Sequence, residues 1–290
     1  MKSIINACEQ IGDCCVNALI SEVSASPKPG LVDRINSGAH RDMDFSTFMK
    51  SIEAISSYFS KFAQIGCSLG SIDENTLEKI RPVGIECEKV MFNATCGINT
   101  HKGAIFSMGI LSTAAGYCYS TLHDLNSNTV CSAASVIAKS SEKDFLIVDD
   151  SDPMTKGRQL YVTYGIWGVR GEASSGFVSV RKYALPVMRE LYNIGCYSDN
   201  DIYLQALLHL MTQVVDTNVI SRCGIEAVEY VKSSAKNVLT LGGALTQQGR
   251  EELFRMDKEF IKHNISPGGC ADLLSVTITL YTMENLLQTP

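Results

Sequence analysis

Apolar residues recur at helical spacing along most of the chain, and this periodicity limits the fold more than any other feature. In residues 4–23 the apolar positions lie three to five residues apart, with polar residues on the other faces. Similar patterns predict helices at 45–62, 74–90, 105–119, 121–139 and 199–215, and a terminal helix beginning near residue 268. The alternation of apolar and polar residues typical of a half-buried β-strand is sustained nowhere. We therefore predict an all-α fold, a single domain over residues 1–290 in which long Gly- and Pro-containing polar loops between the helices form the functional site.

The overall composition is that of a globular protein, because 45% of the 290 residues are apolar and 19% are charged. A net charge of -6 argues against a nucleic-acid partner, which normally requires a basic face. We find no signal peptide and no uncharged apolar run of about 18 residues, so we expect no membrane partner. The eleven cysteines are scattered and lack a Cys-x-x-Cys motif, which favours free thiols in a cytoplasmic protein. A homodimer is compatible with this composition.

A polar loop over residues 27–44 follows the first predicted helix. Pro27 and Pro29 each fix their own φ angle and push the preceding residue out of the α region. A stiff loop of this kind can hold polar groups in place before a ligand arrives. The groups that it offers are Lys28, Asp33, Arg34, Asn36, His40 and Asp42. The alternative interpretation is a capped loop between two helices with ordinary surface charges.

The second polar stretch, residues 95–104, leads directly into a predicted helix of small residues. Its glycines flank Asn99, His101 and Lys102. At a helix N-terminus the backbone N–H groups and the positive end of the dipole favour a phosphate. The GxxxxGK[ST] pattern of a P-loop is absent, so an ordinary glycine-rich turn is the alternative.

Two later stretches place charged residues beside glycines. Residues 164–177 hold four glycines around Arg170 and Glu172, which would either grip a phosphate or form a surface ion pair. Residues 264–272 open the terminal helix, where the carboxylate of Asp272 would also favour the helix dipole.

Residues 140–158 are the least core-like part of the chain and contain several helix breakers. We interpret this segment as a mobile loop or lid. Within it, residues 145–148 are a candidate short strand, buried turn or edge of the site.

Five blocks occur in order along the chain: SPKPGLVDRINSGAHRDMD (26–44), GINTHKGAIFSMG (97–109), GVRGEASSGF (168–177), DTNV (216–219) and NISPGGCADLL (264–274). Together they resemble the triphosphoribosyl-dephospho-coenzyme A synthase family, and the resemblance runs from about residue 8 to the C-terminus. Cys270 stands where the family usually has a serine, and residues 140–158 are not recognisably matched.

The resemblance implies an all-α cytoplasmic transferase that uses ATP and 3′-dephospho-CoA as substrates. Such an enzyme transfers the 5-triphosphoribosyl group of ATP to the 2′-hydroxyl of 3′-dephospho-CoA and releases adenine. The product is the precursor of the citrate lyase prosthetic group, and a close relative serves malonate decarboxylase. We expect the product to pass to a transferase that acts on the acyl carrier protein of the lyase or decarboxylase.

This reaction needs a carboxylate near an oxocarbenium-like transition state and a general base for the incoming hydroxyl. It also needs cations for two polyanionic substrates, with Mg²⁺ on oxygen ligands. The predicted catalytic residues are Asp33, His40, Asp42 and Glu172. The predicted metal ligands are Asp42, Asp216 and Asp272. The predicted substrate-binding residues are Lys28, Gly30, Arg34, Asn36, Asn99, His101, Lys102, Gly103, Arg170, Asn218, Arg222, Ser266, Gly268 and Gly269.

Neither the 27–44 loop nor the 97–103 loop carries enough positive charge to neutralise a triphosphate. We therefore expect the two loops to converge on one site. Two other functions stay open at this point. One is a metal-dependent nucleotide glycohydrolase or phosphohydrolase with water as the nucleophile, and the other is a binding module for a CoA derivative.

Overall fold

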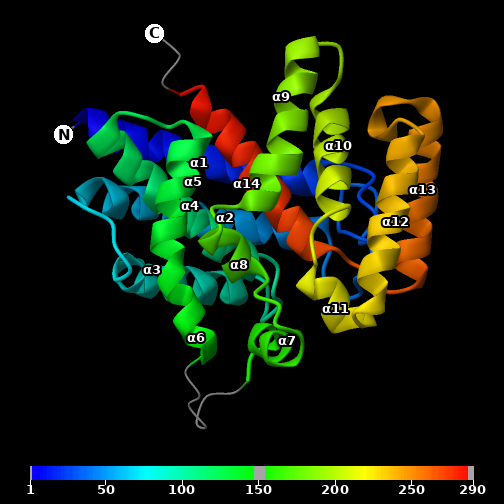
Figure 1. Ribbon diagram of the computed structural model, residues 1–290, viewed down its shortest axis with the longest axis horizontal. Helices are drawn as coiled ribbons and strands as arrows, with labels where there is room; N and C mark the ends of the chain where they lie inside the picture. The colour runs from blue at the N-terminus through cyan, green and yellow to red at the C-terminus, as the bar shows by residue number, and fades with distance from the viewer. Residues whose placement is uncertain (1, 147–153, 287–290) are drawn as a thin grey trace.

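The computed structural model describes residues 2–146 and 154–286, and these ranges contain helices and no β-strand (Figure 1). The prediction of a globular all-α fold is thus confirmed. The α-helices are α1 (Lys2–Ser24), α2 (Phe45–Ser68), α3 (Thr76–Ala94), α4 (Lys102–Leu122), α5 (Ser127–Ala138), α6 (Lys143–Leu146), α7 (Lys156–Tyr164), α8 (Val169–Ser174), α9 (Leu185–Ile194), α10 (Asp199–Met211), α11 (Thr217–Cys223), α12 (Glu226–Thr240), α13 (Gln247–Lys262) and α14 (Gly268–Glu284). Three short segments complete the fold: the 3-10 helices Lys139–Glu142 and Gly243–Leu245 and the π-helix Val180–Ala184.

The predicted helices all occur, with differences at their ends. Asp44 is the N-cap of α2, where its carboxylate accepts a hydrogen bond from the Thr47 N–H at 2.8 Å. The fifth helix starts later than the apolar pattern suggests. His123, at the end of α4, adopts a left-handed conformation, and α5 begins only after the N-cap residue Asn126.

The 140–158 segment contains more helix than the sequence predicts. Short helices occupy residues 139–146, and α7 begins at Lys156. Residues 145 and 146 are helical rather than part of a strand, whereas 147–148 lie outside the described residues. The lid role stays a prediction.

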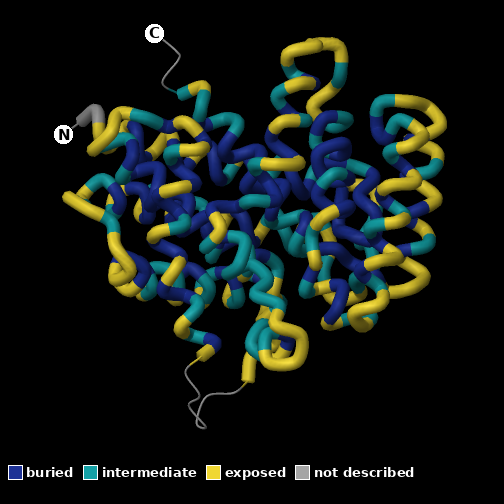
Figure 2. Tube along the Cα trace, in the orientation of Figure 1, coloured by how far each residue is buried: buried dark blue, intermediate teal, exposed yellow. Residues whose placement is uncertain are grey.

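Two helices, α4 and α14, form the centre of the molecule. Residues 107–116 of α4 and residues 273–280 of α14 are buried without interruption, as expected of helices that are apolar on every side. In Figure 1, α14 passes between the group formed by α1–α5 and the group formed by α9–α13, and it contacts helices of both. Figure 2 shows the deepest burial along this central region. None of the described helices is long and apolar enough to cross a membrane.

The crossing of α2 and α4 depends on glycine. A Cβ atom on Gly66 of α2 would collide with the Thr113 carbonyl of α4, and a Cβ on Gly116 of α4 would collide with the Ala63 carbonyl of α2. The two backbones therefore lie in direct contact. Because α4 also carries residues 102 and 103 at its N-terminal end, this contact fixes the place of one wall of the site described below.

Alanine substitutions at two helical glycines test this close packing. We expect Gly116→Ala to lower the free energy of unfolding by about 1–3 kcal/mol, because the added methyl group overpacks the crossing. Gly84→Ala in α3 is the matched control, since no atom of residues 2–146 and 154–286 outside its own helix backbone and chain neighbours lies within 4 Å of its new Cβ. This control should raise the free energy of unfolding by about 0.5–1 kcal/mol through helix propensity. Urea denaturation of both variants measures the difference, and equal effects of the two substitutions would contradict the close packing.

Candidate active site

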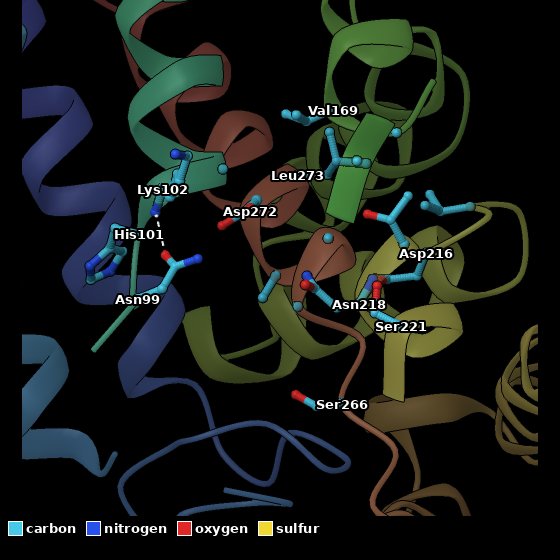
Figure 3. Close-up of a pocket in the computed structure, with 18 of the residues that line it drawn as sticks. Asn99, His101, Lys102, Val169, Asp216, Asn218, Ser221, Ser266, Asp272 and Leu273 are labelled. Atoms are coloured by element: carbon cyan, nitrogen blue, oxygen red, sulfur yellow. Dashed lines mark hydrogen bonds between the residues drawn. The ribbon is translucent and has the colours of Figure 1, made fainter. Parts of the chain in front are cut away.

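One cavity of about 940 Å³ lies where the N-terminal ends of α4 and α14 meet. The 27–44 loop, α8 and the start of α11 supply the rest of its wall. Figure 3 shows Asp272 between two groups of residues, with Asn99, His101 and Lys102 on one side and Asp216, Asn218 and Ser221 on the other. The 27–44 and 97–103 loops thus converge as expected.

Most of the residues predicted from sequence line this cavity. Those that do are Lys28, His40, Asp42, Asn99, His101, Lys102, Gly103, Arg170, Glu172, Asp216, Asn218, Arg222, Ser266, Gly268, Gly269 and Asp272. Those that do not are Gly30, Asp33, Arg34 and Asn36.

Asp33 shapes the 27–44 loop and does not reach the cavity. One carboxylate oxygen accepts the N–H groups of Ile35 and Asn36 at 2.7 and 3.0 Å, and the other accepts the Lys28 N–H at 2.9 Å. Both oxygens are therefore occupied by backbone donors. The predicted catalytic role of Asp33 lacks geometric support, and we assign it to holding the loop.

Asp257 of α13 fixes the same loop from outside. Its two oxygens accept the Gly30 N–H at 2.9 Å and the side-chain amide of Asn36 at 3.0 Å. Gly30 has a φ of 70°, and a side chain there would collide with the Ile265 carbonyl. Gly30 and Asn36 therefore position the loop rather than contact a substrate. Arg34 lies on the outer side, where its guanidinium donates to the Ser24 hydroxyl at 3.1 Å.

A buried ion pair lies beneath the cavity. The ammonium of Lys28 binds the carboxylate of Glu22, near the end of α1, and both side chains are almost fully buried. Burial raises the pKa of Glu22, although the Lys28 ammonium opposes this rise. Removing either partner would leave an uncompensated buried charge. Part of the positive charge of Lys28 is thus already used within the protein.

Asp216 joins α11 to α14. One oxygen accepts the N–H groups of Asn218 and Val219 at 2.8 and 3.3 Å, and the other accepts the Cys270 N–H at 2.9 Å. The residue is buried, and burial raises its pKa while these three hydrogen bonds oppose the rise. With both oxygens occupied, Asp216 is poorly suited to the predicted role of metal ligand.

Asp272 has a different environment in the first turns of α14. Across residues 2–146 and 154–286 it makes no hydrogen bond and no ion pair, and its oxygen lies where a Cβ on Gly103 would be. Burial raises the pKa of Asp272 well above its usual range, and the negative charges of Glu22 and Asp216 raise it further. A carboxylate without a partner, facing the N-terminus of a second helix, is available to a cation or a substrate proton.

Glu172 is the second recessed carboxylate of the cavity. It accepts hydrogen bonds from the backbone N–H and the hydroxyl of Ser179. Burial raises the pKa of Glu172, and these hydrogen bonds only partly oppose it. A raised pKa suits a general base that works near neutral pH.

His40 and Asp42 lie at the mouth of the cavity. The Nε2 atom of His40 is 2.8 Å from the Ser266 hydroxyl, and its Nδ1 is 3.8 Å from a carboxylate oxygen of Asp42. Burial and the charge of Arg222 lower the pKa of His40, while Asp42 opposes this shift. Since 64% of the Asp42 side chain is exposed, it is a peripheral carboxylate.

The other cations of the site are partly engaged by the protein. Lys102 binds Glu88 at 3.0 Å, and Arg170 binds Asp144 and the Ser141 carbonyl, each at 3.2 Å. Arg222 donates to the Ala39 carbonyl and to Asn264, and so ties α11 to the 27–44 loop. These contacts hold the cations at the cavity wall.

Sequence reasoning missed two features of the wall. The first is Glu22. The sequence feature that could have indicated it is its place six residues before Lys28, a lysine between two prolines. The second is Trp167, which lines the cavity and packs against Tyr161 and Phe145 with ring centroids 4.2 and 5.9 Å away. Trp167 lies within the glycine-rich 164–177 stretch, where the charged residues drew attention instead.

Comparisons with known proteins match almost the whole chain. Residues 8–290 match the family described as ATP:dephospho-CoA triphosphoribosyl transferase. The probable 2-(5''-triphosphoribosyl)-3'-dephosphocoenzyme-A synthase of Salmonella gallinarum is 41% identical over 273 residues, which cover 93% of this chain and 90% of that protein. The 2-(5''-triphosphoribosyl)-3'-dephosphocoenzyme-A synthase of Pectobacterium atrosepticum is 41% identical over 266 residues, with coverages of 91% and 86%. The Klebsiella pneumoniae protein of the same name is 40% identical over 271 residues, with coverages of 93% and 89%. No solved structure gives a significant match.

Asp→Asn substitutions at Asp272 and Asp216 distinguish a carboxylate that has no partner among the described residues from one that binds backbone N–H groups. Because the pKa of Asp272 is raised in the folded protein, the wild type loses stability relative to Asp272→Asn as the pH rises from about 4, the unfolded value. Asp272→Asn should therefore unfold at a higher temperature than the wild type at pH 8, with the difference shrinking as the pH falls. Thermal unfolding followed by circular dichroism over this range measures it.

Asp216→Asn is the matched control for that experiment. In the wild type, backbone N–H groups bind both oxygens of Asp216, whereas the asparagine amide keeps only one acceptor oxygen. We therefore expect Asp216→Asn to lower the free energy of unfolding by about 1–3 kcal/mol. An Asp272→Asn protein that is also destabilised at pH 8 would contradict the free state of the Asp272 carboxylate.

Proposed function

The chain belongs to the ATP:dephospho-CoA triphosphoribosyl transferase family, and from this premise we propose how its cavity performs the reaction. The enzyme transfers the 5-triphosphoribosyl group of ATP to the 2′-hydroxyl of 3′-dephospho-CoA and releases adenine. The observation that carries the assignment to this cavity is the meeting of two helix N-termini, several cations and two recessed carboxylates around a single space.

The N-terminal ends of α4 and α14 are suited to the phosphate groups. Both helices are long, and the positive ends of their dipoles face the cavity, where Lys102 adds a flexible cation. The glycines at these ends keep the backbone accessible. A side chain on Gly268 would collide with Asn218, and one on Gly103 would displace Asp272.

We assign the two recessed carboxylates to different tasks. Glu172, with its raised pKa and its orientation fixed by Ser179, accepts the proton of the attacking 2′-hydroxyl. Asp272 lies between the two walls of the cavity and is the negative group best placed to face the oxocarbenium-like sugar or a bound cation.

Magnesium is the cation that we propose for this site. No three His, Cys, Asp or Glu side chains of the described residues are grouped to hold a metal ion without the substrate. Mg²⁺ commonly binds one or two protein carboxylates together with substrate phosphates, and a partner-free Asp272 fits that pattern. The ion would neutralise phosphate charge and so let the triphosphate approach the carboxylates. Asp42, at the mouth, stays a candidate ligand, whereas the oxygens of Asp216 are occupied.

An aromatic wall completes the site. Trp167 separates the cavity from Phe145 and Tyr161, which do not line it, and Phe106 lines it nearby. The Arg170 guanidinium lies between the rings of Phe106 and Phe145, with its central carbon 5.3 and 4.5 Å from their centroids. We assign this wall to an adenine ring of one of the two nucleotide substrates, because purines stack well on such surfaces.

The fate of the product follows from the family and belongs to the same proposal. The triphosphoribosyl-dephospho-CoA would pass to a transferase that acts on the acyl carrier protein of citrate lyase or malonate decarboxylase. We place these steps in the cytoplasm, where the eleven cysteines, all free, would stay reduced.

Product analysis tests the transferase directly. We expect adenine to appear only when ATP and dephospho-CoA are both present, together with a product whose mass equals dephospho-CoA plus the triphosphoribosyl group. Chromatography with mass spectrometry measures both. Adenine released at full rate without dephospho-CoA would indicate a glycohydrolase, and release of ADP a phosphohydrolase; either result would refute the proposal.

Trp167 is the only tryptophan of the chain, so its fluorescence reports directly on the aromatic wall. We expect saturable quenching by ATP or by dephospho-CoA, and little change with inorganic triphosphate. Trp167→Leu should weaken binding of the quenching nucleotide by about 1–3 kcal/mol in calorimetry, the usual value of one stacked base. Tyr230→Leu, which removes an aromatic ring that does not line the cavity, should leave both affinities unchanged. Equal losses of nucleotide affinity in the two variants would refute the assignment of the aromatic wall to an adenine ring.

A further inference from the structure

His101 occupies an unusual position at the wall of the cavity. It is the N-cap residue of α4, it is only 3% exposed, and it lies beside Asn99 and Lys102 (Figure 3). The ring of Phe48 packs edge-on against the imidazole with centroids 4.9 Å apart. The sequence predicts that His101 binds a substrate, but it does not indicate the protonation state of the imidazole or which residues pack against it.

Two hydroxyl groups lie behind the imidazole, on the side of its Nδ1 atom. The Thr100 hydroxyl donates to the Ser51 hydroxyl oxygen at 2.8 Å, and the same Ser51 oxygen lies 2.7 Å from Nδ1 of His101. The Ser51 hydroxyl can donate its own hydrogen to Nδ1 while it accepts the Thr100 hydrogen, and we assign it this direction. Nδ1 is then an acceptor, and a neutral ring carries its hydrogen on Nε2.

The ring is neutral under ordinary conditions. Burial, reinforced by the nearby Lys28 ammonium, lowers the pKa of His101 to about 3. Lys28 is the charged group that acts on the imidazole, and its own charge is paired with Glu22. His101 thus offers a fixed hydrogen-bond donor without a positive charge.

The Nε2 atom has no hydrogen-bond partner within residues 2–146 and 154–286, although it is fully buried. A buried donor that lacks an acceptor is costly, so each such group calls for an explanation, and a catalytic role is one of them. The Nε2–H group also belongs to a residue that lines the substrate cavity.

We propose that the Nε2–H of His101 donates a hydrogen bond to a ring nitrogen of the departing adenine, N7 or N3, and that Ser51 and Thr100 are positioning residues for this donor. The proposal rests on the transferase function. A ring nitrogen of adenine is an uncharged acceptor, which suits a neutral donor whose neighbour Phe48 is apolar.

The step balances without any further reactant. The bond between C1′ of the ribose and N9 of adenine breaks, and its electron pair stays on the base, where the hydrogen bond to N7 or N3 stabilises the new charge. The 2′-oxygen of dephospho-CoA bonds to C1′, and its proton passes through the general base to the released adenine. His101 stays neutral throughout, because its low pKa disfavours a second proton and the N–H of a neutral imidazole is only weakly acidic.

Substituted enzymes combined with substituted ATP test the contact. His101→Phe, which keeps the ring and loses the donor, should lower kcat about 100-fold with ATP, the usual effect of losing one donor to a developing charge. His101→Gln, which restores an N–H near the Nε2 position, should recover part of this loss.

The same pair of proteins is then compared on 7-deaza-ATP and 3-deaza-ATP. The analogue that lacks the accepting nitrogen should slow the wild-type enzyme strongly and slow His101→Phe little further, because the contact is already absent. If both deaza analogues slow the two proteins by the same factor, His101 does not contact the base, and the proposal fails. If the His101→Phe and wild-type rates differ only for ATP analogues with altered phosphate groups, the Nε2–H group contacts the triphosphate instead. This result would also refute the proposal.

The positioning role of Ser51 has its own readout. In ¹⁵N NMR spectra the His101 ring of the wild type should show the Nε2–H tautomer, whereas Ser51→Ala should show a mixture of tautomers and a kcat about tenfold lower at similar KM. Ser51→Thr, which keeps the hydroxyl, should restore both. Ser107→Ala removes another fully buried serine hydroxyl, one that has no hydrogen-bond partner among the described residues, and should change neither the tautomer nor kcat.

These outcomes are separable from the transferase function itself. A wild-type protein that forms no triphosphoribosyl product would refute the proposed function. A wild-type protein that forms the product while Ser51→Ala retains the tautomer and the rate would refute only the positioning role.

Discussion

The rest of the site depends on two helices that are buried on every side and whose N-terminal ends meet at one cavity. At the N-terminal end of α14 the carboxylate of Asp216 accepts one of the free N–H groups, that of Cys270, while it also caps α11. Glycine contacts with α2 hold α4 in place from the other side. Because both helices belong to the core, the groups at their ends are held as firmly as the core itself, which is the support that a preorganised site needs.

This arrangement has an electrostatic cost that the substrates relieve. The cavity brings Glu22, Glu172, Asp216 and Asp272 into a region of low exposure, and burial raises the pKa of each. Glu22 is paired with Lys28 and Asp216 with backbone donors, which leaves Asp272 without compensation. We propose that a triphosphate arriving with Mg²⁺ supplies the missing positive charge. On this proposal, the carboxylate of Asp272 lowers the stability of the free protein and is kept because the reaction requires it.

The sequence predicts the fold and the loops of the site more reliably than the role of each residue. Helical periodicity gives the all-α fold, and most of the polar residues in the glycine-rich loops line the cavity. Asp33 and Asp216 show why roles are harder to predict: a carboxylate that binds backbone N–H groups looks the same in sequence as one that faces a ligand. Glu22 and Ser51 lie within helices at positions set by tertiary packing, so no local pattern indicates that they support the site.

We propose that Asp272 binds the cation that accompanies the triphosphate. Proton release on binding of ATP with Mg²⁺, obtained by calorimetry in buffers of different ionisation enthalpy, tests it most directly. Because the pKa of Asp272 is raised in the free protein and a bound cation would lower it, the wild type should release more protons than Asp272→Asn in the pH range where the free carboxyl is partly protonated. Identical proton release by the two proteins across the whole pH range would contradict the account.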